Sequence, residues 1–182
     1  MQRLFIAINC NDEIKAILLS VQEIIKAQSI KGSFSRPENL HLTLVFLGET
    51  PEEQIPGICS VIDEAMIPPL APFTLTFSPT GCFRHSHKEL WWIGVERSDP
   101  SLKILERLRR RIIEGLSAKS IVFDERPFKA HITLGREIKH DAPIEIPERK
   151  ISFPVSRLSL MKSERVSGIL VYTEIFDKDL SG

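Results

Sequence analysis

Two short stretches, His41-Leu42-Thr43-Leu44 and His131-Ile132-Thr133-Leu134, carry the same pattern of histidine, aliphatic residue, threonine and leucine. Side chains alternate between the two faces of a β-strand, so a histidine and the threonine two residues later share one face. The aliphatic residues point to the opposite face, into a core. Each stretch is therefore predicted to be a strand that presents one imidazole and one hydroxyl side by side.

The repetition of the pattern favours a functional interpretation over a structural one. A single histidine on a strand is usually a structural residue with its hydrogen bonds satisfied. This chain has only five histidines, yet two of them begin the same pattern at comparable places in the halves 1–80 and 81–182. We therefore expect a divergent internal duplication, with two closely packed lobes and a cleft between them that holds both histidines and both threonines.

Composition places the chain among globular proteins and limits its partners. It has 182 residues, of which 42% are hydrophobic, and its 24 Lys and Arg balance its 24 Asp and Glu. A net charge of zero argues against a long basic surface that follows a nucleic-acid backbone, but it allows a local pocket for one phosphate. Three scattered cysteines indicate reduced thiols and a cytoplasmic location. No apolar run approaches the length of a membrane span, so no membrane association is expected.

Hydrophobic periodicity predicts strands that alternate with three helices. Helices are expected at 12–28, from a Thr50–Glu53 capping box to about 66, and at 100–117. The regions 29–38, 78–89 and 141–149 are expected to be loops. The expected strands are 3–9, 40–47, 73–77, 90–95, 129–135, 152–161 and 168–176.

Paired histidines suit one kind of chemistry in particular. Opening a 2′,3′-cyclic phosphate requires a base that deprotonates water and an acid that protonates the leaving ribose oxygen. Because attack and departure are in line, acid and base must stand on opposite sides of phosphorus, as two histidines on opposed strands would. An unperturbed pKa near 6.5 allows one ring to be neutral and the other charged near neutral pH. The hydroxyls of Thr43 and Thr133 would donate hydrogen bonds to the phosphate oxygens.

Arg136 lies five residues after His131, just beyond the second motif. In an ideal strand its side chain would point away from the face that carries the histidine. A bend at Gly135 would turn it back toward the phosphate, and otherwise it is a solvated arginine at the end of a strand.

Other polar and aromatic residues carry weaker signals. The segment Cys82–His87 contains a cysteine and two histidines, but its basic neighbours and the lack of a fourth ligand favour a mobile polar loop over a metal site. His140 is expected to be exposed. One of the adjacent Trp91 and Trp92 is expected in the core. The residues that could stack on a nucleobase are the other tryptophan, Phe46, Phe83 and Phe128.

Taken together, these segments resemble the 2H phosphoesterase superfamily, and within it the RNA 2′,3′-cyclic phosphodiesterase family, also called 2′–5′ RNA ligase-like. The resemblance extends over nearly the whole chain. It is carried by RLFIAI (3–8), NLHLTLVFLG (39–48), Gly81-Cys82-Phe83, PFKAHITLGR (127–136) and FPVSRLSLMKSE (153–164). Lys129-Ala130 is a small departure, since many relatives have proline next to this histidine.

The resemblance implies an α+β fold in which two pseudo-symmetric lobes, each with an antiparallel sheet, line a central cleft in one domain over 1–182. It implies His41 as proton donor, His131 as proton acceptor, and Thr43, Thr133 and Arg136 as phosphate ligands, without a metal or cofactor. Members of the family hydrolyse 2′,3′-cyclic phosphate ends of RNA to 2′-phosphates, and some also join RNA ends through a 2′–5′ bond.

Three alternatives remain at this stage, of which one is metal-dependent hydrolysis. The same site could act on a small cyclic nucleotide, such as ADP-ribose 1″,2″-cyclic phosphate, in place of RNA 3′ termini. A protein of another class, a non-catalytic module that binds nucleotide or RNA, could use the same cleft. In each case a monomer is expected.

Overall fold

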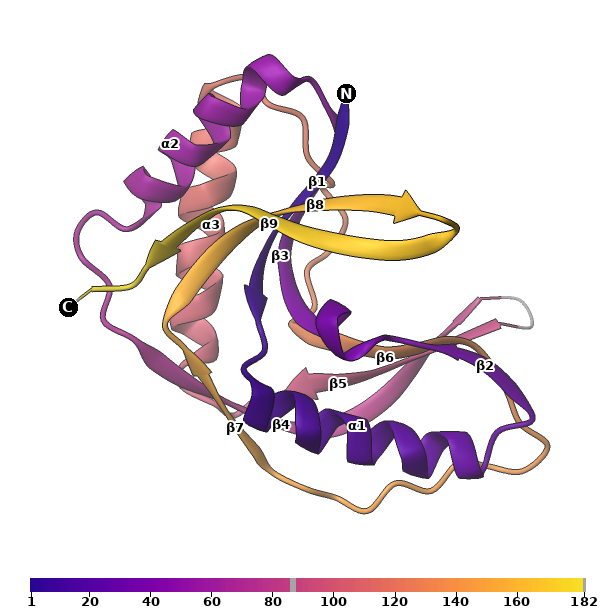
Figure 1. Ribbon diagram of the computed structural model, residues 1–182. Coiled ribbons are helices and arrows are strands. Elements are labelled where there is room, and N and C mark those ends of the chain that lie inside the picture. Colours follow the sequence, from indigo (N-terminus) through magenta and orange to yellow (C-terminus); the bar gives the residue numbers. More distant parts are fainter. Residues whose placement is uncertain (86–87, 182) are drawn as a thin grey trace.

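Antiparallel pairing joins nine strands into one sheet that three α-helices flank in this computed structural model, which describes residues 1–85 and 88–181 (Figure 1). The strand order is β7-β4-β5-β6-β3-β1-β8-β9, and β2 pairs with β6. The strands are β1 (Gln2–Asn9), β2 (Lys31–Phe34), β3 (His41–Thr50), β4 (Phe73–His85), β5 (Lys88–Val95), β6 (His131–Lys139), β7 (Ile151–Val155), β8 (Arg157–Val166) and β9 (Ile169–Asp179). The helices are α1 (Asp12–Ala27), α2 (Ile55–Ala65) and α3 (Leu102–Ala118), with short 3-10 turns at Pro37–Asn39 and Glu52–Gln54. The predicted α+β class is confirmed.

The sheet consists of two groups of strands that meet at the two motif strands. One group contains β1, β3, β8 and β9, and the other contains β7, β4, β5, β6 and β2. Between β3 and β6 a single register pair, Leu42 with Ile132, joins the groups. These are the aliphatic residues inside the two repeated motifs. One histidine and one threonine therefore lie on each side of this narrow joint, on β3 and on β6.

The two longest helices, α1 and α3, each cross over: each follows a strand of one group and packs against the other group. Helix α1 follows β1 but contacts β2 and β6, while α3 follows β5 and contacts β3 and α2 (Figure 1). The chain's last strands, β8 and β9, join β1 through β8. As a result, neither group of strands is formed by residues 1–80 or 81–182 alone.

The helical stripes expected from the sequence face this core. Helix α1 buries Ile14, Leu18, Val21 and Ile25, and the side chain of Asn11 caps it by accepting a hydrogen bond of 2.9 Å from the backbone nitrogen of Ile14. Helix α3 buries apolar residues at helical spacing, namely Leu105, Leu108, Ile112 and Leu116.

Four local expectations were wrong. The segment 152–161 is not one strand, because β7 ends at Val155 and pairs with β4, while β8 begins at Arg157 and pairs with β1. The region 29–38 contains β2, because Ser33 and Phe34 pair with the end of β6. The region 78–89 is largely strand, because β4 continues to residue 85 and pairs with β5. Thr50 does not open a capping box: it is the buried last residue of β3, paired with Gln2, and its hydroxyl donates to the carbonyl of Gly48.

Candidate active site

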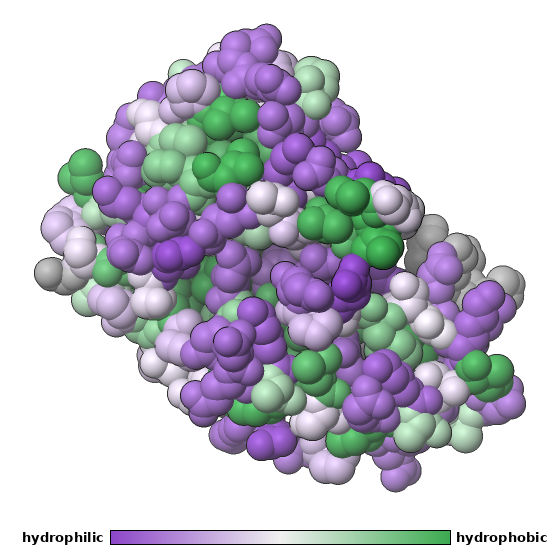
Figure 2. All heavy atoms as spheres, viewed as in Figure 1, coloured by the Kyte–Doolittle hydropathy of each residue, from purple (hydrophilic) through white to green (hydrophobic). Residues whose placement is uncertain are grey.

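A cavity of 340 Å³ lies at the joint between the two groups of strands. Its lining includes all the residues that the sequence predicted for the site, together with Tyr172 of β9: His41, Thr43, His131, Thr133 and Arg136. The two repeated motifs, which are far apart in the chain, thus contribute to one site. The β8–β9 hairpin borders the cavity, and Figure 2 shows apolar side chains gathered at the outer end of this hairpin, where Val166 and Ile169 are exposed.

Both imidazoles are held by the backbone in the same way. Nδ1 of His41 lies 2.8 Å from the carbonyl oxygen of Asn39, and Nδ1 of His131 lies 2.6 Å from that of Lys129. Since a carbonyl can only accept, each Nδ1 carries a hydrogen and donates it. In a neutral ring Nε2 then has the free lone pair, and in a charged ring it has a proton to give.

Aromatic neighbours fix the planes of the two rings. Phe5 packs against His41 with ring centroids 4.7 Å apart, and Tyr172 contacts the same imidazole edge-on at 5.2 Å. On the other side of the cleft, Phe83 lies edge-on to His131 at 5.3 Å. The rings are therefore oriented before any ligand arrives, which lowers the cost of organising them for reaction.

A β-bulge follows the threonine in both motifs. On β3, consecutive residues of β1 pair with the residues on either side of Leu44, which is therefore an extra residue. On β6, consecutive residues of β5 pair with the residues on either side of Leu134, which is extra in the same sense. An extra residue reverses the alternation of side chains beyond it.

This reversal decides where Arg136 points. Beyond Leu134 the side chain of Arg136 returns to the face of His131, where it lines the cavity and its charge lowers the pKa of both histidines. A turn back toward the site was expected from a bend at Gly135, and a bulge at Leu134 produces it. The bulge at Leu44 likewise brings the side chain of Phe46 back to the face of β3 that carries His41.

Burial and nearby cations disfavour the charged form of both histidines. Burial, followed by the charges of Arg136 and His131, lowers the pKa of His41 to about 4 against the support of the Asn39 carbonyl. Burial also lowers the pKa of His131, with the charges of Lys129 and Arg136 acting in the same direction. In the free protein near neutral pH, His41 is therefore neutral. An anionic ligand would oppose these effects and raise both pKa values.

Buried polar side chains hold the second motif strand in place. Nε2 of Gln22, a residue of α1 that is 1% exposed, donates to the carbonyls of Ser35 and Leu134 at 2.8 and 2.7 Å. The hydroxyl of Ser35 donates to the carbonyl of Thr133 at 2.8 Å. These bonds anchor β6 at the bulge that directs Arg136 into the cavity.

Sequence reasoning missed several residues of the site. Asn39 positions His41 through its backbone, and its side-chain amide donates to the carbonyl of Leu170 in the β8–β9 hairpin at 3.0 Å. Tyr172 and Gln22 come from elements far from either motif. A polar Gln22 within the apolar stripe of α1 is the one signal that could have drawn attention to it.

The remaining sequence candidates have other surroundings. His140 was expected to be exposed, but its Nε2 lies 2.9 Å from a carboxylate oxygen of Glu89 and its side chain is 18% exposed. Trp91 and Trp92 are both buried, on opposite faces of β5. Cys82 lies in β4, and the expectations for residues 86–87 fall outside the described part of the chain.

Within residues 1–85 and 88–181, no group of three or more His, Cys, Asp or Glu side chains is arranged to hold a metal ion. None of the helices in the described ranges has the length and apolarity needed to cross a membrane. Cys10, Cys59 and Cys82 are free thiols.

Comparisons with known proteins find relatives that match nearly the whole chain. A Thermus thermophilus RNA 2′,3′-cyclic phosphodiesterase is 32% identical over 99% of this chain and 91% of its own length. An Escherichia coli protein of the same name is 31% identical over 96% of this chain and 94% of its own.

Solved structures extend the likeness to the fold. The crystal structure of a T. thermophilus protein matches with a TM-score of 0.77 and 32% identity over 98% of this chain and 97% of that one. E. coli LigT complexed with 3′-AMP matches with a TM-score of 0.76 and 26% identity over 100% and 98%. A family model matches residues 13–167. The chain belongs to the 2′-5′ RNA ligase superfamily.

Proposed function

We propose that this protein hydrolyses RNA 2′,3′-cyclic phosphate ends to 2′-phosphate ends without a metal ion, using His41 and His131 as acid and base. The observation that carries the proposal is the convergence of the two imidazoles, each bound at Nδ1 by a backbone carbonyl, on one cavity with Arg136. The names of the T. thermophilus and E. coli relatives support the same substrate.

The proposed reaction is a single in-line displacement. Nε2 of His131 accepts a proton from water as its oxygen attacks phosphorus. The bond from phosphorus to the ribose 3′ oxygen breaks, and Nε2 of His41 gives its proton to that oxygen. The products are a 2′-phosphate and a free 3′ hydroxyl, with one histidine charged at the start and the other charged at the end.

The surrounding groups stabilise charge on the phosphate. Arg136 and the hydroxyls of Thr43 and Thr133 donate to the non-bridging oxygens as their charge increases. The acid must be protonated when substrate is bound, although burial lowers the pKa of His41 in the free protein. The negative charge of the bound cyclic phosphate raises the pKa of His41, so that the imidazole takes up a proton from solvent and can act as the acid.

The two-lobed, pseudo-symmetric organisation within a single domain also belongs to this proposal. It is supported by the shared carbonyl contact at Nδ1 and by the bulge after the threonine in both motifs. We further propose a monomer that acts in the cytoplasm, and reversible 2′–5′ ligation of RNA ends by the same site.

The direct test incubates an RNA oligomer that ends in a 2′,3′-cyclic phosphate with the protein in EDTA, followed by identification of the product end group. A 2′-phosphate is expected. His41→Ala and His131→Ala should each lower kcat by about 10²- to 10⁴-fold. His140→Ala, which removes a histidine outside the cavity, is the matched control and should retain activity. Unchanged turnover in either motif variant, or activity that requires a metal ion, would refute the proposal.

A further inference from the structure

A second cavity, of 840 Å³, lies on the side of Lys129 that faces away from His41 and His131. Phe128 and Lys129 line both this second cavity and the groove that contains Thr43, His131 and Arg136. The second cavity is therefore adjacent to this groove. Its other walls include Val95 and Leu102, which are apolar, and the charged residues Arg97, Glu106 and Glu148.

Lys129 is held at the boundary between the catalytic cleft and the second cavity. Its ammonium nitrogen lies 3.6 Å from the centroid of the Trp92 ring, a cation–π contact. The indole lies close against Gly81 and Gly94, where a Cβ atom would approach ring carbons to 2.6 and 2.9 Å. Because these glycines leave room for the flat ring, Trp92 can hold the ammonium group at one position next to His131.

Arg97 places a second positive charge beside Lys129. Burial lowers the pKa of Lys129, and the charge of Arg97 lowers it further. Within residues 1–85 and 88–181, neither Arg97 nor Lys129 forms an ion pair with a carboxylate. Two neighbouring cations without a counter-ion repel each other, and an anion bound between them removes that cost.

The groove on the other side of the catalytic pair is less suited to a phosphate. It also has a volume of 840 Å³, and its cations include Arg3, Lys162 and Arg165. Arg3 lies 3.9 Å from Glu49, and Lys162 lies 2.9 Å from Glu164. Carboxylates lie close to two of these cations, and the third, Arg165, donates to the carbonyl of Gly168. Arg136 also lines this groove, but it belongs to the catalytic cavity.

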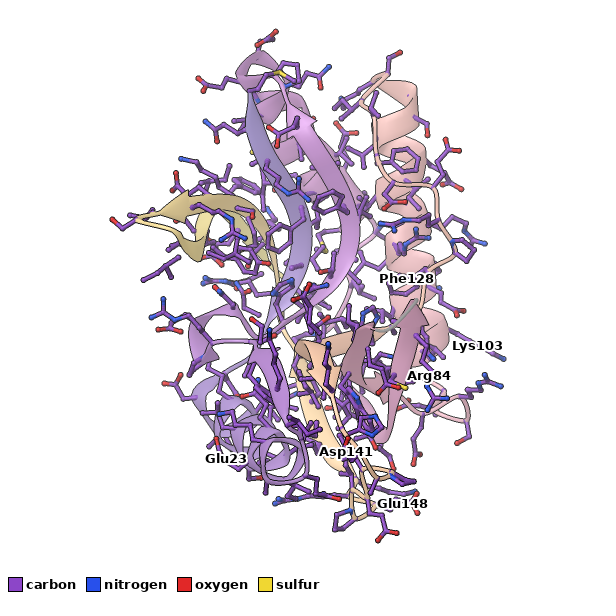
Figure 3. The ribbon with its side chains drawn as sticks, turned by 90° about the vertical axis from the view of Figure 1, so that its right-hand side faces the viewer. Glu23, Arg84, Lys103, Phe128, Asp141 and Glu148 are labelled. Atoms are coloured by element: carbon purple, nitrogen blue, oxygen red, sulfur yellow. The ribbon has the colours of Figure 1, made fainter. Side chains whose placement is uncertain are left out.

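The other groups of the second cavity match a nucleoside. Val95, Leu102 and Phe128 offer apolar surface to a base. Glu148 accepts a hydrogen bond from Ser78 and lies far from Phe128 along this face (Figure 3). Its carboxylate can accept hydrogen bonds from a ribose hydroxyl or a base amine. The cavity thus has the cations Lys129 and Arg97 near the catalytic cleft and the acceptor Glu148 farther away. This arrangement suits a ligand in which a phosphate is followed by a nucleoside.

We propose that Arg97 and Lys129 bind the phosphate that links the terminal nucleotide to the rest of an RNA chain, and that the second cavity holds the neighbouring nucleoside. The proposal rests on the proposed function, because it takes the cyclic phosphate to lie between His41 and His131. It makes the end of an RNA chain, and not a cyclic mononucleotide, the preferred substrate of this site.

The experiment compares kcat/KM for a 2′,3′-cyclic mononucleotide and for a dinucleotide with the same cyclic end. Arg97→Ala should lower the value for the dinucleotide by about tenfold and leave that for the mononucleotide unchanged, since one charge-assisted phosphate contact is lost. Retained mononucleotide turnover also shows that the variant is folded. The matched control is Arg3→Ala, which removes an arginine of the opposite groove that does not line the catalytic cavity, and it should leave both values unchanged.

Salt provides a second measurement. The wild-type value of log kcat/KM should fall more steeply with log salt for the dinucleotide, by about 0.7 in slope, and Arg97→Ala should abolish the difference. An equal effect of Arg97→Ala on both substrates, no effect on either, or a dinucleotide-specific loss in Arg3→Ala would overturn the assignment.

The two proposals can fail separately. If the protein turns over the mononucleotide but Arg97→Ala has no selective effect, the second subsite is wrong and the proposed function stands. If neither substrate is hydrolysed, the proposed function fails. Calorimetric binding of a dinucleotide that ends in a 2′-phosphate, to wild type and to Arg97→Ala, then still tests the subsite: equal affinities refute it, and weaker binding by the variant supports it.

Discussion

The hydroxyl of Thr43 lies 2.9 Å from Nε2 of His41, whereas in the described part of the chain Thr133 forms no hydrogen bond with His131. The two half-sites therefore differ in the free protein although their sequences match. Because Nδ1 of His41 donates to a carbonyl, Nε2 of a neutral His41 accepts a hydrogen bond from the hydroxyl of Thr43. The proposed function requires Thr43 to turn from the imidazole to the phosphate when substrate binds, whereas it requires no such change of Thr133.

Replacement of either threonine tests its proposed contact with the phosphate. Thr43→Val and Thr133→Val should each lower kcat by about 10²-fold, the typical effect of removing one donor to a developing negative charge. The corresponding serine variants keep the hydroxyl and should retain most of the activity. Steady-state kinetics on an RNA end measure this, and a valine variant with wild-type kcat would remove that threonine from the reaction.

The pH dependence of the reaction should differ between free enzyme and complex. Since burial lowers the pKa of both His41 and His131, the bell-shaped profile of kcat/KM should be centred on the acid side of pH 6.5. The profile of kcat should lie at higher pH, because the bound anion raises both pKa values. The two limbs belong to the pair and not to single residues. Coincident profiles would show that the substrate charge does not act on the imidazoles.

Stability should also depend on the ionisation of His41. The unfolded chain takes up this proton near pH 6.5, while the folded protein resists it until about pH 4. Lowering the pH through this range therefore favours unfolding, by as much as about 3 kcal/mol from this group. Denaturant titrations should show a smaller loss between pH 6.5 and 4 for His41→Asn than for wild type. Parallel curves for the two proteins would argue against a depressed pKa at this position.

The anchor of the second motif strand gives a prediction about a residue outside the cavity. Gln22→Leu removes one buried and one partly buried hydrogen bond, and should cost about 2 kcal/mol of unfolding free energy although the Leu134 carbonyl keeps the Ser35 backbone N–H as a donor. Gln28→Leu is the matched control: Gln28 also donates to two carbonyls, at 3.0 and 2.8 Å, but at an exposed position where water can replace it. Equal losses in the two variants would show that burial of these bonds is not what matters.

The parts of the fold that could be predicted are those specified by local periodicity. Alternation at His41–Leu44 and spacing in α1 and α3 depend on neighbouring residues, so their elements and buried faces follow from the sequence. The short strand β2 has no such pattern. Ser33 and Phe34 are extended because β6, about a hundred residues later, offers them a partner.

The site shows the same division. Its histidines and threonines were found because they repeat. The direction of Arg136 could not be read from parity, because a bulge depends on how two strands pair and not on either strand alone. The contact of Tyr172 with His41 and the hydrogen bond from the Asn39 side chain to Leu170, likewise, exist only once β9 and the turn before β3 lie together.

The crossing of the helices between the two groups of strands has a consequence for how this protein can be divided. A fragment with residues 1–80 would retain α1 but lack β6, the strand that α1 contacts, and it would lack α3, the partner of α2. The other fragment would carry β8 without β1. If two genes each encoded one of these fragments, each chain would need strands or helices of the other chain to complete its fold. The two histidines therefore belong to one sheet that neither fragment can form alone, and neither half-site can be gained or lost as an independent module.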